Sequence, residues 1–100
     1  MLRKNSDTNG AGHLYNNSSL GSINSVTIKF SSSTSKNAMI GITFGNEVIS
    51  DAVSDSTLKE QADANKVVTF NNDSKDNTYF NLSVMNNYNC QLVELTINFD

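Results

Sequence analysis

The sequence has no tryptophan and no proline, and it has only one cysteine and one histidine. Without proline, the turns must be made by Gly, Asn, Asp and Ser. A single cysteine cannot form an intrachain disulfide, so the sequence does not assign a redox compartment. A structural zinc site is disfavoured as well, because such sites take four ligands from Cys and His.

Positive charge and long apolar runs are also scarce. The chain has 7 Lys and Arg residues and a net charge of −3, and its longest basic run is Arg3-Lys4. Nucleic-acid binding needs clustered positive charge, so we expect no nucleic-acid partner. No stretch approaches the ~20 apolar residues of a membrane-spanning helix, and we expect no membrane contact. Residues 1–6 lack the apolar run of a signal peptide, so either the protein is not exported by that route or an export signal has been removed from this sequence.

Two long stretches alternate apolar with polar residues. In Ser22–Phe30 every second residue from Val26 onward is apolar, and in Gln91–Phe99 the same holds from Leu95 onward. This period of two is typical of a strand with one buried face. We expect the two strands to lie side by side, with their apolar faces in one thin core.

Shorter segments complete the predicted set of strands. They are His13–Tyr15, Ala38–Phe44, Glu47–Ser50, Lys66–Phe70 and Thr78–Met85, with Met1–Lys4 as the tail of a further strand. Asn9-Gly10 is a hairpin signal, and Asn71–Asn77 is expected to be a hairpin loop. Thr57–Glu60 fits a helix capping box. We favour an irregular connection or an edge strand there, because Leu58 alone gives a helix little to bury.

These elements predict one domain over residues 1–100. The apolar fraction of 37 % is below the usual range, which indicates a sparse core under a polar surface. Short strands separated by turn signals predict an all-β fold, an antiparallel two-sheet β-sandwich. The long connections favour a jelly-roll-like arrangement over a simple meander.

Four segments carry a resemblance to a known class of module: Gly12–Asn17, Leu20–Ile28, Thr78–Leu82 and Gln91–Ile97. They resemble the accessory β-sandwich domains, jelly-roll and carbohydrate-binding-module-like, of secreted Firmicute proteins and phage virion proteins. Such modules usually begin with a strand before the glycine turn. Only Met1–Lys4 would correspond to that strand here, which suggests a fragment or a shortened version.

The resemblance implies a function without transferring any site residue. It implies a non-catalytic module that binds carbohydrate or a cell surface, with a glycan or a protein surface as partner. The alternative is a phage or virion structural or decoration protein that acts by assembly, for which a homo-oligomer is the expected state. The locations considered are extracellular, as part of a larger exported protein, and the virion.

Catalysis is not expected. His13 and Cys90 form the only Cys–His pair that the chain offers. A lone cysteine at the start of a strand is more often a buried packing residue than a nucleophile. Five aspartates fall in predicted loops, without the fixed separation that glycoside hydrolysis requires: Asp51, Asp55, Asp63, Asp73 and Asp76.

Glycan-binding sites commonly use flat aromatic rings that stack against the sugar. With tryptophan absent, the available platforms are tyrosines. The predicted contact residues are Tyr88 and Tyr15, with Asn87 and Asn89 as hydrogen-bonding neighbours. The alternative for Tyr15 is that it caps the core with its hydroxyl in water.

Asp73 and Asp76 supply oxygen ligands in one loop, so calcium is a candidate there. Lys75 lies between them, and the loop lacks the glycine and terminal glutamate of a helix–loop–helix site. A solvated loop is therefore the favoured interpretation, and no cofactor is expected.

Overall fold

The computed structural model describes residue 2, residues 12–62 and residues 66–99. These residues form strands and irregular connections, and none of them lies in a helix that could cross a membrane. The strands are β1 (His13–Tyr15), β2 (Ile23–Phe30), β3 (Met39–Gly45), β4 (Leu58–Gln61), β5 (Val67–Asn71), β6 (Tyr79–Val84) and β7 (Leu92–Phe99).

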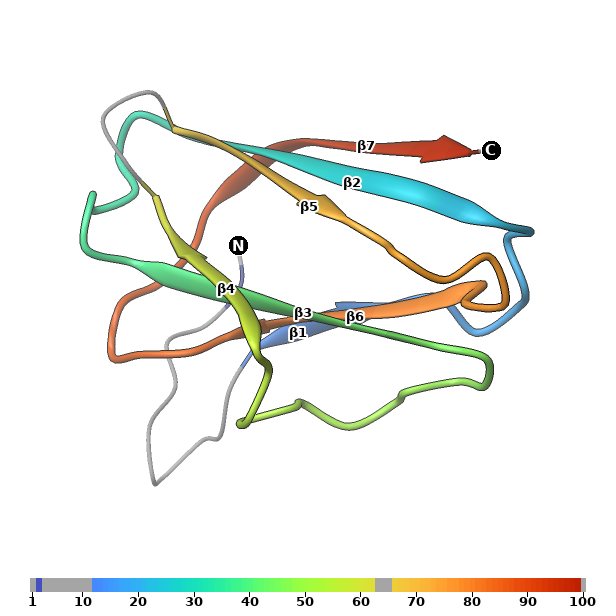
Figure 1. The fold of residues 1–100 in the computed structure, drawn as a ribbon. Coiled ribbons are helices and arrows are strands. Elements are labelled where there is room, and N and C mark those ends of the chain that lie inside the picture. The colour runs from blue at the N-terminus through green and yellow to red at the C-terminus, as the bar shows by residue number, and fades with distance from the viewer. Residues whose placement is uncertain (1, 3–11, 63–65, 100) are drawn as a thin grey trace.

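The strands form two antiparallel sheets that face each other (Figure 1). One sheet has the order β1-β6-β3-β4 and the other has the order β5-β2-β7. The predicted antiparallel β-sandwich is therefore confirmed. The jelly-roll assignment within that class stays a prediction.

The pairing of the two longest strands is also confirmed. β2 pairs with β7, with Val26 opposite Ile97 and Ile28 opposite Leu95. The register shifts near both ends of this ladder, between Ile23 and Ser25 and between Lys29 and Phe30. Such bulges bend and twist a strand locally. The β2–β7 pair joins two segments that lie far apart in the sequence.

The core lies between the sheets and follows the predicted alternation. Val26 and Ile28 from one sheet and Ile40 and Leu82 from the other have no exposed surface. The remaining buried apolar residues are Ile23, Phe30, Ala38, Ile42, Ala62, Val68, Phe70, Phe80, Val84 and Cys90. Burial of these side chains is the main favourable term in folding such a domain.

Two of the predicted elements are wrong, and at a third position the structure selects one of the alternatives. Glu47–Ser50 is not a strand, and that prediction was wrong. Asn71–Asn77 is not a hairpin loop, because it leads from β5 in one sheet to β6 in the other. Leu58 begins an edge strand, β4. An edge strand was one of the two interpretations that we favoured over a helix at this position. The predictions at residues 1 and 3–4 and at Asn9-Gly10 lie outside the described residues.

Asparagine side chains fasten several connections. Asn16 accepts a hydrogen bond from the Phe80 amide (2.8 Å) and donates to the Thr78 carbonyl (3.1 Å). Asn86 accepts from the Met39 amide (3.1 Å) and donates to the Asn37 carbonyl (2.8 Å). An amide side chain can both donate and accept, so one asparagine satisfies loop backbone in both ways. Part of the asparagine content thus has a structural role.

Candidate functional site

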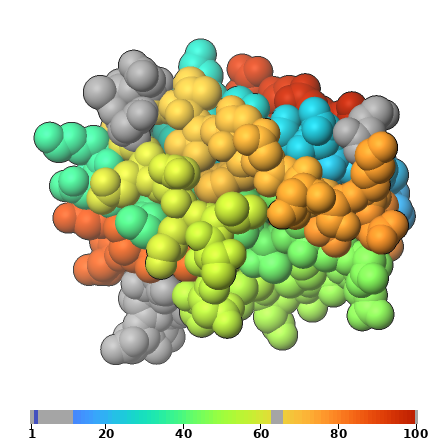
Figure 2. Space-filling view, viewed as in Figure 1, coloured from blue at the N-terminus to red at the C-terminus, as the bar shows by residue number. Residues whose placement is uncertain are grey.

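A pocket of about 370 Å³ opens where β4 begins, at Leu58. Figure 2 shows this face, on which the segment leading into β4 lies beside the loop that follows β5. The pocket is lined by Ile42, Thr43, Phe44, Val53, Asp55, Ser56, Thr57, Leu58, Asn72, Asp73 and Asn77. It combines an aromatic ring, carboxylates, amides and hydroxyls, which is a suitable composition for a polar ligand with apolar patches.

The pocket exists because β4 is shorter than β3. β4 covers the edge of β3 only from Met39 to Ile42, and the last residues of β3 have no β4 neighbour. The Gly45 carbonyl accepts from the Thr78 amide on the β6 side (3.0 Å). Since backbone groups alternate in direction along a strand, the amide and carbonyl of Phe44 point to the opposite, uncovered edge.

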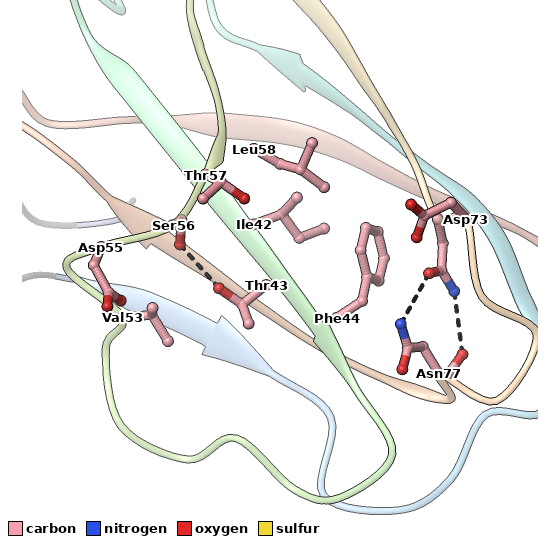
Figure 3. A pocket seen from close by; sticks show the side chains of 11 residues that line it. Ile42, Thr43, Phe44, Val53, Asp55, Ser56, Thr57, Leu58, Asp73 and Asn77 are labelled. Atoms are coloured by element: carbon pink, nitrogen blue, oxygen red, sulfur yellow. Dashed lines mark hydrogen bonds between the residues drawn. The ribbon is translucent and has the colours of Figure 1, made fainter.

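Phe44 supplies the aromatic surface. Its side chain is half-buried and packs against the core. In Figure 3 its ring lies between Asp73 and Asn77 on one side and Ile42 and Leu58 on the other. A flat ring in this position offers an apolar face to a bound molecule.

One wall is the loop after β5, which is held by Asn72. Its side-chain amide donates to the carbonyls of Ile23 (2.8 Å) and Ser74 (3.0 Å). Its side-chain oxygen accepts from the Ser74 amide (3.3 Å) and from the Asn77 side chain (3.2 Å; Figure 3). These bonds form an Asx-type turn and fix the loop without proline. The exposed side chain of Asp73 is therefore carried on an ordered backbone.

The other wall is the connection between β3 and β4, which is clamped by Asn81. Although Asn81 and Ser83 face away from the core, both are fully buried, because residues 49–53 cover them. Asn81 donates to the carbonyls of Ile49 (2.6 Å) and Asp51 (2.9 Å) and accepts from the Ser83 hydroxyl (2.6 Å). The Val53 amide donates to the same hydroxyl (3.0 Å), which ties this wall to β6.

The predicted contact residues do not line this pocket. Tyr88 lies between Asn87 and Asn89 in the loop after β6, and 43 % of its surface is exposed. Tyr15 lies on β1 opposite Asn81, with its ring stacked on His13 at 5.9 Å between centroids. Because β1 runs antiparallel to β6, Tyr15 lies at the end of β1 away from the Tyr88 loop. Their role in binding stays a prediction.

Of the two candidate calcium ligands, Asp73 lines the pocket and Asp76 is exposed beyond it. In the part of the chain that the structure describes, no three His, Cys, Asp or Glu side chains gather as a metal ion would require. Calcium binding there therefore stays a prediction.

Cys90 has the packing role that was expected of it. It is fully buried, and burial raises the pKa of its thiol to about 11. A nucleophilic cysteine instead needs a lowered pKa, because the thiolate is the reactive form. His13 uses its Nε2 in a hydrogen bond with the Ser50 carbonyl (2.9 Å).

The sequence did not indicate Phe44, Asp55 or Asn77 as site residues. Phe44 reads only as the last apolar residue of an alternating strand. The surroundings of Phe44 depend on how far β4 extends along β3. Asp55 and Asn77 lie in irregular connections that reach the pocket. No sequence periodicity carries that information.

Comparison with known proteins adds no relative. We found no match to this chain among protein-family models, among curated proteins or among solved structures.

Proposed function

We propose that the protein is a non-catalytic binding module that holds a glycan in the pocket beside Phe44. The observation that carries the proposal is the composition of the pocket, in which the half-buried Phe44 ring lies between Asp55 and Asp73 on opposite walls. Sugar rings present apolar C–H faces and many hydroxyl groups. An aromatic ring suits the first, and carboxylates and amides accept or donate hydrogen bonds to the second.

The geometry adds two further supports. The backbone of Phe44 points to an uncovered strand edge, so it offers one donor and one acceptor to a ligand. Both walls are held by buried or half-buried asparagine side chains, Asn81 and Asn72. A site on ordered walls loses little conformational entropy on binding, which favours affinity.

A matched pair of variants in one loop tests the proposal. Soluble oligosaccharides of plant and bacterial cell-wall type are titrated into the protein, with backbone amide chemical shifts as the readout. We expect saturable shifts at Phe44 and Asp73 and a loss of affinity of about ten-fold or more in Asp73→Asn, because a charge-assisted hydrogen bond is weakened. Asp76→Asn is the control, since it removes the same charge from an exposed position outside the pocket.

Three results would contradict parts of this proposal. Absence of binding to any glycan would remove the function. Binding that is lost in Tyr88→Ala and unchanged in Asp73→Asn would keep the function and move it to the Tyr88 loop. Release of new reducing ends from a bound oligosaccharide would remove the non-catalytic assignment.

A further inference from the structure

The charged side chains that line the pocket beside Phe44 are both acidic. Asp55 and Asp73 lie on opposite walls, and the described lining residues include no Lys, Arg or His. The other polar groups of the lining are the neutral amides and hydroxyls of Asn, Ser and Thr side chains. A molecule that enters the pocket therefore meets negative charge on two sides.

Neither carboxylate is neutralised by the fold. Within the described residues, the side chains of Asp55 and Asp73 make no hydrogen bond and no ion pair. The nearest basic residues along the chain are Lys59 and Lys75, and both are exposed and outside the lining. Lys59 follows Leu58 on β4, and successive side chains of a strand point to opposite faces. Both carboxylates are thus available to a ligand.

Further acidic residues belong to the same two walls. Asp51 lies in the connection between β3 and β4, and Asp76 lies in the loop after β5; both are exposed. The whole chain has a net charge of −3. A cleft surrounded by charge of one sign raises the local concentration of ligands that carry the opposite sign. The electrostatic surroundings therefore favour a cationic ligand over an anionic one.

We propose that the pocket selects glycans that carry protonated amino groups, such as oligomers of glucosamine, over neutral and acidic glycans. This selectivity rests on the glycan-binding function proposed above. An ammonium group forms charge-assisted hydrogen bonds with a carboxylate, and these are stronger than the bonds of a neutral hydroxyl. The face of the Phe44 ring also attracts a cation. A glycan built from uronic acids would instead place like charges together, which weakens binding.

The arrangement suits an oligomer with repeated amines better than a single amino sugar. The two carboxylates lie on either side of the Phe44 ring (Figure 3). With successive amino sugars across the ring, one amine pairs with Asp73 and another with Asp55. The walls are held by Asn72 and Asn81, so the carboxylates are in place before a ligand arrives. Such preorganisation lowers the entropy cost of binding.

Three tetrasaccharides of equal length test the charge preference: those of glucosamine, N-acetylglucosamine and galacturonic acid. They are titrated at about pH 5.5, above the usual carboxylate range and below that of amines, with backbone amide shifts as the readout. We expect the glucosamine tetramer to bind about five-fold more tightly than the acetylated one at low salt, because each exposed ion pair contributes a small factor. The galacturonic acid tetramer should bind most weakly. The advantage of the glucosamine tetramer should shrink at roughly 0.3 M salt.

Charge-removing variants locate the preference in the pocket. Asp55→Asn and Asp73→Asn each keep the shape of an exposed side chain and remove one charge. Each alone should lower the ratio of the affinities for the glucosamine and acetylated tetramers, and the double variant should bring the ratio near one. Asp76→Asn is the control, because it removes the same charge outside the pocket. The affinity for the acetylated tetramer separates the loss of charge from damage to the pocket.

The other outcomes overturn the selectivity, and they distinguish it from the function on which it rests. Equal binding of the glucosamine and acetylated tetramers removes the charge preference and leaves the glycan-binding function standing. A preference that survives in the double variant, or that falls equally in Asp76→Asn, assigns the effect to the overall charge of the protein. If no tetramer binds, the glycan-binding function and the selectivity both fail.

Discussion

Replacing Asn81 by alanine should release the connection that forms one wall of the pocket. The side chain is fully buried and makes three hydrogen bonds, to the carbonyls of Ile49 and Asp51 and from the hydroxyl of Ser83. Ser83 in turn accepts from the amide of Val53, which lines the pocket. The substitution therefore affects both the stability of the fold and the shape of the site.

The expected loss of stability follows from these bonds. Each intramolecular hydrogen bond contributes about 1 kcal/mol net, and a buried polar group left without its partner costs about 1–3 kcal/mol. The Asp51 residue is exposed and its carbonyl can be rehydrated, whereas the Ser83 hydroxyl is buried and cannot. We therefore expect a loss of about 3 kcal/mol in the free energy of unfolding. Because the free energy of unfolding of a native domain is about 5–15 kcal/mol in total, this loss is a substantial fraction of it.

Urea unfolding followed by far-ultraviolet circular dichroism measures this value. Asn81→Asp should lose as much or more, because an ionised carboxylate cannot donate to the two carbonyls. Asn87→Ala, in an exposed loop, is the control and should change the free energy of unfolding by less than about 0.5 kcal/mol. An Asn81→Ala variant as stable as the control would refute the clamp, and with it the ordered wall on which the glycan proposal depends.

Two further predictions concern buried positions. Gly41→Ala should destabilise the fold by about 1–3 kcal/mol in the same urea assay, because a Cβ there would lie 2.7 Å from Met85 Sδ and 3.0 Å from Ser56 Cβ; a neutral effect would contradict this packing. The Cys90 thiol should resist a thiol reagent at pH 8 in the native protein and react fully in urea. Since burial raises the pKa of this thiol to about 11 from its ordinary value of 9.0, the unfolded chain ionises first as pH rises from 9 to 11. Over this pH range the free energy of unfolding should fall by on the order of 2–3 kcal/mol more in the unaltered protein than in Cys90→Ala. If the free energy of unfolding of both proteins falls equally with pH, the raised pKa of Cys90 is contradicted.

The strand pairing shows how far local pattern determines this fold. Alternation in residues 22–30 and 91–99 identified both long strands and their inner faces, and their similar length and pattern suggested that they are neighbours. The same pattern could not show that β7 lies at an edge. Leu95 alternates in the sequence as regularly as Ile28, yet Ile28 is fully buried and Leu95 is not. Exposure at an edge depends on which strands are absent beside it.

The polar residues show the opposite case. Asn81 and Ser83 occupy the outward positions of β6, and alternation alone assigns such positions to solvent. Both are buried, because the connection between β3 and β4 folds back over them. A period of two distinguishes the two faces of a sheet, but it does not report whether a loop covers the outer one. The candidate calcium ligand Asp73 was noticed for its oxygen atoms, and only the fold brought it near Phe44.

The amino-acid sequence alone was sufficient for the all-β class, the inward side chains, the packing role of Cys90 and the observed strands other than β4, for which an irregular connection and an edge strand were both left open. These properties depend on the residue and its near neighbours in the chain. Tertiary structure decided the order of the strands, the crossing of residues 71–77 between sheets, the pocket beside Phe44 and the open edge at β7. Each of these depends on where a distant segment ends or passes, and strand pairs so far apart in sequence leave no local signal of their register.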